Sequence, residues 1–298
     1  MRLLIAGCGD LGQRVAQGVL DHPADQVWGL RRHPVQNADP DRIHWVTADL
    51  LRPETLQNIA PDITHVLFAA TPDARDEQGY RDLYLHGLQH LVQAVRSPVL
   101  ERVVFISSTA VYGDHGDAWV DENTLAAPSG FNGRVMLEAE QWLEQSGLDS
   151  TGSMSTVSLR LSGIYGPGRT YLLDRLRRGM ARAPAEGVHW ANRIHIDDAA
   201  AAVVHILRMP CPQTLYLVTD DTPLPMRTLY EALARLAGGP VPALGPVPAA
   251  VSSKRLNNAR LRATGLDLRW PDSRAGHAAL ILADDQPAAP QSGNQASG

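Results

Sequence analysis

The chain has little of what several functional classes require: it contains two cysteines, one lysine and no long apolar run. Cys8 and Cys211 offer neither a disulfide framework nor the spacing of a metal site, so we expect a reducing compartment and no metal. The net charge of −5 comes from interspersed charges without a basic block, which argues against a nucleic-acid partner. No apolar run approaches the ~18 residues that span a bilayer, and the chain opens directly on a predicted strand, which leaves no room for a signal peptide. These absences predict a cytoplasmic protein without a membrane partner.

A glycine-rich loop follows the first predicted strand. Residues 1–6 read as a buried strand, and Gly7-Cys-Gly-Asp-Leu-Gly12 leads from it into a segment with an apolar stripe at helical spacing. In a dinucleotide-binding loop, the first glycine permits the tight turn, the second lets the backbone approach a pyrophosphate, and the third allows close packing of helix on strand. A glycine turn without a ligand is the alternative. The pattern predicts a cofactor site at Gly7, Gly9, Asp10, Leu11 and Gly12.

Short apolar runs alternate with helix-length segments through the first half of the chain, as in a parallel sheet covered on both faces. We therefore expect an α/β fold with a doubly wound parallel sheet, the Rossmann fold. The predicted strands are Leu3–Ala6, Val27–Leu30, His44–Thr47, His65–Ala69, Val103–Ser107 and Val157–Leu161. Between the fourth and fifth strands, an apolar helical face at Leu85, Leu88, Leu91, Val92 and Val95 predicts a crossover helix.

The pattern changes from Tyr165 onward, where Gly and Pro recur and the regular alternation stops. This change predicts a small C-terminal substrate lobe that closes over the ligand. The expected boundaries are 1–165 for the Rossmann domain, 166–283 for a lobe interleaved with it, and 284–298 for a tail. The tail lacks large apolar residues, so we expect it to be disordered.

The end of the second predicted strand indicates which cofactor is used. No acidic residue stands where one would bind a ribose 2′-hydroxyl, and Arg31 and Arg32 stand there instead. A guanidinium can bind a 2′-phosphate in bidentate geometry, so NADP(H) is favoured and NAD(H) is the alternative. A pair of solvated surface arginines is the other interpretation. Asp49 is a candidate acceptor for the adenine amino group or a helix cap. Small residues at a strand end, which admit the cofactor, are Ala69, Ala70 and Thr71.

Further motifs carry a family resemblance. They are Phe105-Ile-Ser-Ser-Thr-Ala-Val-Tyr-Gly-Asp114, followed by Asp121-Glu122 and Pro128, then Leu159-Arg-Leu-Ser-Gly-Ile-Tyr-Gly-Pro-Gly168 and Arg193-Ile-His-Ile-Asp-Asp198. Together with the glycine loop, they resemble the extended short-chain dehydrogenase/reductases, specifically the NAD-dependent epimerase/dehydratase superfamily, over roughly residues 1–282. The resemblance implies hydride transfer between a nicotinamide and a small-molecule carbonyl or alcohol, such as a nucleotide sugar or an aldehyde, and is compatible with a homodimer. It assigns Ser108 to the reacting oxygen and Arg193 to the substrate side. The alternatives are a satisfied strand-end hydroxyl for Ser108 and a surface ion pair with Asp197 or Asp198 for Arg193.

The chain departs from that family at its catalytic pair. Members carry Tyr-x-x-x-Lys early in a helix, but aligning this chain on Leu137–Glu140 puts Asn132 and Met136 at the two positions, and its only lysine is Lys254. An amide does not exchange protons near neutral pH, and a thioether supplies no charge to lower the pKa of a phenol.

Other side chains follow strands whose ends should face the cleft, and Tyr112, His115 and Tyr165 are the candidate acid/base residues. Each also has a structural interpretation, as a packed turn residue or a solvated imidazole. His86 stands where the family commonly has an asparagine, and His195 reads as structural. Two functions stay open: an atypical oxidoreductase or epimerase, and a non-catalytic redox sensor that binds NADP(H).

Overall fold

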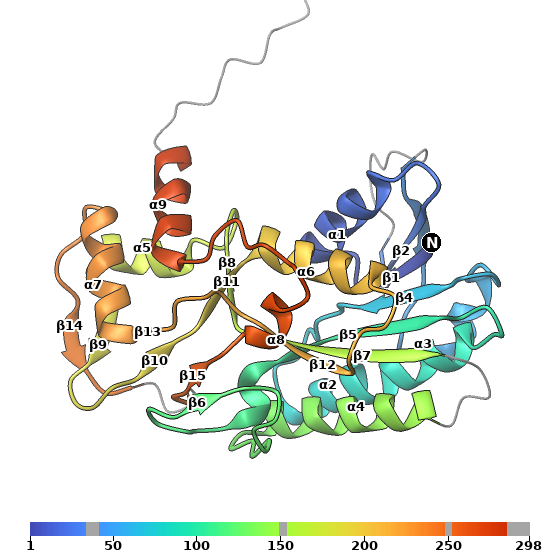
Figure 1. The fold of residues 1–298 in the computed structure, drawn as a ribbon, viewed down its shortest axis with the longest axis horizontal. Coiled ribbons are helices and arrows are strands. Elements are labelled where there is room, and N and C mark those ends of the chain that lie inside the picture. The colour runs from blue at the N-terminus through green and yellow to red at the C-terminus, as the bar shows by residue number, and fades with distance from the viewer. Residues whose placement is uncertain (34–41, 149–153, 248–251, 285–298) are drawn as a thin grey trace, which may run out of the picture.

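The computed structural model describes residues 1–33, 42–148, 154–247 and 252–284. Its centre is a seven-stranded sheet in the order β12-β7-β5-β4-β1-β2-β3 (Figure 1). Every neighbouring pair in this sheet is parallel. The strands are β1 (Arg2–Ala6), β2 (Gln26–Arg31), β3 (His44–Thr47), β4 (His65–Phe68), β5 (Arg102–Ser108), β7 (Ser155–Leu161) and β12 (Leu215–Val218). The predicted α/β fold with a doubly wound parallel sheet is confirmed.

Helices cover both faces of this sheet, as Figure 1 shows. One face carries α1 (Asp10–Leu20) and α6 (Ile196–Arg208), and the other carries α2 (Glu77–Tyr80), the π-helical turn η2 (Arg81–Gly87), α3 (Leu88–Val95) and α4 (Phe131–Leu148). Successive residues of a strand point to opposite faces. In β1, Leu3 and Ile5 accordingly pack with α1 and α6, whereas Leu4 and Ala6 pack with α3 and α4. The sheet is therefore buried on both sides, which explains its nearly continuous apolar strands.

All six strands predicted in the sheet are present within a residue or two, and the seventh, β12, was not predicted. Its four residues lie between proline-rich stretches of the segment expected to form the lobe. A four-residue apolar run carries too little periodicity to be recognised alone. Although they lie in the segment expected to form the lobe, β12 joins the central sheet and α6 packs on it.

The remaining segment builds a small lobe with a core of its own. Leu173, Leu176, Met226, Leu229 and Leu233 form most of that core. Its elements are α5 (Tyr171–Arg177), β9 (Arg182–Pro184), β10 (Trp190–Ala191), β13 (Leu224–Pro225), α7 (Met226–Leu236), β14 (Ala243–Gly245) and α9 (Ser273–Asp284). The tail expected from residue 284 lies, beyond that residue, outside the described part of the chain.

The remaining elements are short. They are η1 (Pro53–Asn58), η3 (Thr109–Tyr112), β6 (Trp119–Val120), β8 (Gly163–Tyr165), β11 (Arg193–His195), β15 (Arg255–Leu256) and α8 (Ala259–Arg262). Strand β8 pairs in parallel with β11, and β6 with β15. Within the described ranges, no helix combines the length and apolarity needed to cross a membrane.

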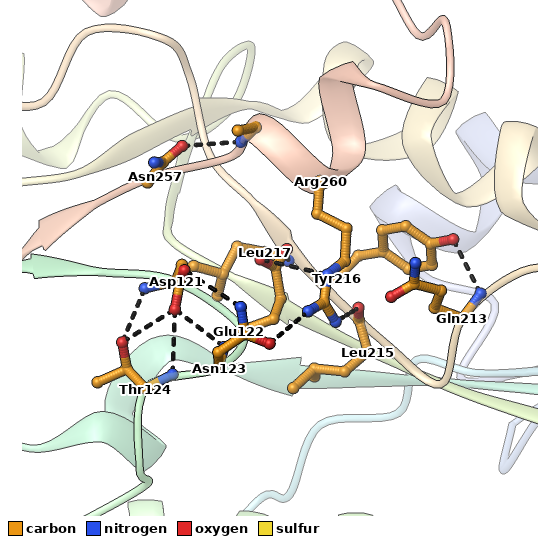
Figure 2. Close-up of polar contacts among 11 residues, drawn as sticks. Asp121, Glu122, Asn123, Thr124, Gln213, Leu215, Tyr216, Leu217, Asn257 and Arg260 are labelled. Atoms are coloured by element: carbon orange, nitrogen blue, oxygen red, sulfur yellow. Dashed lines mark hydrogen bonds and ion pairs between the residues drawn. The ribbon is translucent and has the colours of Figure 1, made fainter.

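The outer edge of β12 is closed by side chains instead of another strand (Figure 2). The Glu122 carboxylate accepts a hydrogen bond of 2.8 Å from the Leu217 N–H, and the Arg260 guanidinium donates one of 3.1 Å to the Leu215 carbonyl. The two side chains pair with each other at 3.6 Å, and burial raises the pKa of Glu122. Unpaired backbone groups on an edge strand invite pairing with another chain. The Glu122–Arg260 pair therefore terminates the sheet.

Replacing Glu122 with alanine should destabilise the protein by about 1–3 kcal/mol, because the Leu217 N–H and Arg260 would lose their buried partner. Urea denaturation followed by circular dichroism measures the change. Glu186→Ala is the control, since Glu186 is exposed and should shift the midpoint little. Equal midpoints for Glu122→Ala and the native chain would contradict the role assigned to this pair.

Candidate functional site

A cleft with a volume of about 910 Å³ lies at the carboxyl ends of the parallel strands. Strand β1 separates β2 and β3 from the strands on its other side, so the order of the sheet reverses at this point. Ligands of open α/β sheets bind at such a reversal. The cleft is lined by most of the residues predicted from the sequence to bind cofactor: Gly7, Gly9, Asp10, Leu11, Arg31, Arg32, Asp49, Ala69, Ala70 and Thr71. Gly12 lies behind the lining.

The three glycines of the loop have three different surroundings. Gly7 has a φ of +83°, and a Cβ there would lie 2.3 Å from Ala70 Cα, so no side chain fits. A Cβ on Gly12 would meet Ile5 at 3.0 Å, which reflects the close packing of α1 on β1. A Cβ on Gly9 would have no neighbour nearer than 3.9 Å. The backbone at Gly9 is therefore open at the N-terminus of α1, and a pyrophosphate fits there.

The arginines at the end of β2 lie at the mouth of the cleft. Arg32 forms a bidentate ion pair with Asp73, in which Nη2 lies 2.6 Å from one carboxylate oxygen. Arg31 lies over the Trp45 ring at 5.8 Å. Asp49 accepts a hydrogen bond of 2.9 Å from the Leu51 N–H in the turn after β3, whereas the N-cap of the following helix is Arg52. Arg32 is about half exposed, Arg31 is partly exposed, and both line the cleft.

The opposite end of the cleft contains Ser108, Asn132 and Met136. Ser108 ends β5, and its hydroxyl accepts a 3.2 Å hydrogen bond from the Ala110 N–H. Asn132 and Met136 lie one turn apart on α4 and both reach the cleft. The family alignment on residues 137–140 is consistent with this placement. The chain thus presents an amide and a thioether where a phenol and an ammonium would be expected.

A buried ionic network lies next to this end of the cleft. Arg160 Nη2 lies 2.6 Å from Glu140 on α4, and Ser107 on β5 donates to the same carboxylate. The Arg160 guanidinium lies 4.6 Å from the centre of the Tyr112 ring. Tyr112 is fully buried, and burial raises its pKa to about 12. The expectation that Tyr112 faces the cleft is therefore not met, because its ring packs on Arg160.

Tyr165 is likewise buried outside the cleft lining, although it was also expected to face the cleft. Its ring stacks on His277 with centroids 4.0 Å apart and meets His195 edge-on at 5.1 Å. Desolvation and the nearby Asp220, Asp198 and Asp272 raise its pKa, so the phenol stays protonated. His195 caps α6 by accepting from the Asp197 N–H at 3.2 Å, which agrees with a structural role. Tyr165 therefore packs between the start of α6 and helix α9.

The remaining candidates lie outside the lining of the cleft. His115 bonds to the Tyr112 carbonyl at 2.9 Å, Arg193 donates to the Asn192 carbonyl at 3.1 Å, and His86 lies 3.5 Å from Asp82. Among the described residues, no group of three or more histidine, cysteine or acidic side chains is arranged to hold a metal ion.

The lining also contains polar residues that were not predicted from the sequence as site residues, among them these four: Asp73, Tyr80, Asp82 and Arg169. Tyr80 meets Phe131, the first residue of α4, edge-on at 5.4 Å. Asp82 lies in the π-helical turn η2, a type of turn frequent at functional sites. None of the four belongs to a recognisable motif. Only their place in the chain could have indicated a role in the cleft, since three of them lie between β4 and the crossover helix α3.

The model of the family described as NAD dependent epimerase/dehydratase matches residues 3–216. The chain belongs to this family. A solved structure described as a putative NAD-dependent epimerase/dehydratase from Methylobacillus flagellatus is 36% identical, with a TM-score of 0.78 and coverage of 96% of this chain and 99% of the other.

Two curated relatives are similar to the present chain over most of their length. Protein YeeZ of Escherichia coli K12 is 28% identical over 91% of this chain and 97% of its own. The 3-diazoavenalumate denitrifying reductase of a Streptomyces species is 29% identical over 86% and 87%. The similarity therefore spans the Rossmann domain and most of the lobe.

Asp220, at the end of β12, generates a pH-dependence of stability. It is 1% exposed, accepts a 3.1 Å hydrogen bond from the Ser273 N–H, and has a pKa raised by burial from 3.8 to about 8. Because the folded pKa is raised, Asp220 contributes most stability below about pH 4, and this contribution is lost as the pH rises toward 8.

Asp220→Asn should therefore gain stability relative to the native chain between pH 4 and 8, and the difference should level off above pH 8. Urea denaturation at pH 5, 7 and 9 measures it. Asp267→Asn, at an exposed carboxylate, is the control and should give a flat difference. A flat difference for Asp220→Asn would refute the assignment.

Proposed function

We propose that the protein is an NADP(H)-dependent oxidoreductase that transfers a hydride between the nicotinamide and a carbonyl or secondary alcohol of a small molecule. The observation that carries this proposal is the single cleft that joins the open backbone of Gly9, the arginines after β2 and the Ser108 hydroxyl. Membership of the NAD dependent epimerase/dehydratase family supports it, as does the reductase name of one relative. A nucleotide sugar or an aldehyde is the proposed substrate class, with the cytoplasm as the location and a homodimer as the assembly.

Each end of the cleft has a separate task in this proposal. The N–H groups at the start of α1 bind the pyrophosphate, and Arg31 and Arg32 bind the 2′-phosphate. The bound nicotinamide supplies or accepts the hydride. Ser108 donates a hydrogen bond to the substrate oxygen, which stabilises the negative charge that develops on it as hydride adds to the carbonyl carbon, and the resulting alkoxide takes its proton from solvent water. Asn132 can hold the substrate by hydrogen bonds but cannot exchange its proton.

A non-catalytic NADP(H) sensor is the second candidate, and one observation favours it. Asn132 and Met136 both reach the cleft, so the two family positions are present in space and lack an acid and a cation. A sensor needs cofactor binding without proton transfer. The retained Ser108 hydroxyl favours the enzyme, because nothing in cofactor binding alone requires it.

The cofactor preference tests the first part of the proposal. Native protein should bind NADPH more tightly than NADH, and Arg31→Ala with Arg32→Ala should reduce that preference about tenfold or more, because charge-assisted hydrogen bonds contribute roughly 1.5–3 kcal/mol each. Calorimetric titration measures both affinities. Asp73→Asn is the matched variant: it frees Arg32 from its ion pair and should strengthen NADPH binding alone. Tighter binding of NADH by native protein would refute NADP(H) specificity.

Activity separates the enzyme from the sensor. Oxidation of NADPH is followed with a panel of aldehydes, ketones and sugar nucleotides, and Ser108→Ala should lose about 2–4 kcal/mol of transition-state stabilisation. Asn132→Tyr with Met136→Lys restores the family pair one turn apart and should raise carbonyl reduction. If native protein and this double variant both bind NADPH and neither turns over, the sensor replaces the oxidoreductase.

A further inference from the structure

A short turn of the lobe carries an arginine into the cofactor cleft. Residues 166–169 follow β8 as Gly-Pro-Gly-Arg, and the Arg169 N–H donates to the Gly166 carbonyl at 3.0 Å. Proline at the second position and a glycine with positive φ at the third are typical of a type II turn, and Gly168 has a φ of +74°. Arg169 is the last residue of this turn and lines the cleft beside the glycine loop.

The base of the turn is fixed by packing. Gly166 has a φ of +145°, and a Cβ there would approach Ile196 Cγ2 to 2.6 Å, so the chain passes tightly against the start of α6. The preceding Tyr165 is held between His277 and His195. Burial lowers the pKa of His277 to about 4, so its stacked ring is neutral at physiological pH. The turn therefore projects Arg169 from a rigid support.

Arg14 and Arg169 both pair with Asp10 at the start of α1, and Arg169 is the less firmly held of the two. Asp10 pairs with Arg14 at 3.0 Å and with Arg169 at 3.3 Å. Arg14 also pairs with Asp197 on α6, so two carboxylates hold it, and it does not line the cleft. Asp10 is the one ion-pair partner that Arg169 has among the described residues. Both side chains are about two-fifths exposed, and an exposed pair of this kind is weak.

We propose that Arg169 is a cofactor-binding residue contributed by the lobe. Its guanidinium releases the Asp10 carboxylate and binds the pyrophosphate of the nicotinamide dinucleotide. The inference rests on the proposed function. The open backbone at Gly9 and the Asp10 carboxylate lie at the same end of α1. A pyrophosphate bound at Gly9 would therefore lie beside the Arg169 guanidinium. A guanidinium forms stronger, bidentate hydrogen bonds with phosphate oxygens in a cleft than with an exposed carboxylate. Arg14 remains to neutralise Asp10. Cofactor binding thereby ties the lobe to the Rossmann domain.

The test compares both dinucleotides, because both contain the pyrophosphate. Arg169→Ala should weaken binding of NADPH and of NADH by the same factor, about tenfold or more, in calorimetric titrations of the full chain. The NADPH to NADH ratio should stay unchanged, unlike in variants of Arg31 and Arg32. Arg178→Ala removes an equal charge from an exposed site of the lobe outside the cleft and should change neither affinity more than about twofold.

A second variant tests whether Arg169 contacts the pyrophosphate directly or only neutralises the Asp10 carboxylate. If Arg169 contacts the pyrophosphate, Asp10→Asn combined with Arg169→Ala stays as weak as Arg169→Ala alone. Recovery of native affinity in the double variant would overturn the inference, as would unchanged affinity in a folded Arg169→Ala protein. Failure of the native protein to bind either dinucleotide would instead remove the proposed function, and this inference with it.

Discussion

The close approach of the chain at Gly7 to the chain at Ala70 is the constraint on which the site depends. The first residue after β1 and the second residue after β4 nearly touch, because a Cβ on Gly7 would lie 2.3 Å from Ala70 Cα. This contact occurs where the strand order reverses, so it sets the floor of the cleft and the direction in which α1 begins. The arginines at the end of β2, Ser108 at the end of β5 and the open backbone at Gly9 all line the cleft above this floor.

A buried ion pair supports α4 at the end of the cleft that contains Ser108, Asn132 and Met136. Met136 and Glu140 lie one turn apart on α4, and Glu140 remains in a buried ion pair with Arg160. Breaking a buried pair by removing one partner costs about 3–5 kcal/mol, which constrains this part of the helix independently of any chemistry. The buried Glu140–Arg160 pair therefore holds the backbone of α4 in place whatever side chains stand at residues 132 and 136.

The sequence predicted the sheet and much of the cleft because both depend on local patterns. Buried parallel strands read as apolar runs, and the glycine loop has a fixed spacing, so β1 and Gly9 are recognisable without tertiary information. The ion pair of Arg169 with Asp10 joins residues 159 positions apart, and that of Arg32 with Asp73 spans 41 positions. Such pairs depend on how distant turns meet, which no local pattern encodes. Tyr112 and Tyr165 follow strands as expected, but the direction of each ring is set by its packing partners.

The side-chain cap on β12 has a consequence for assembly. Since Glu122 already occupies the Leu217 N–H and Arg260 the Leu215 carbonyl, a second copy of the chain could not form a regular strand ladder at that margin. Two copies that associate without disturbing this cap cannot form a continuous sheet through β12. Their contact surface there must be made from side chains, whose shapes and charges can specify one partner more narrowly than a repeating backbone.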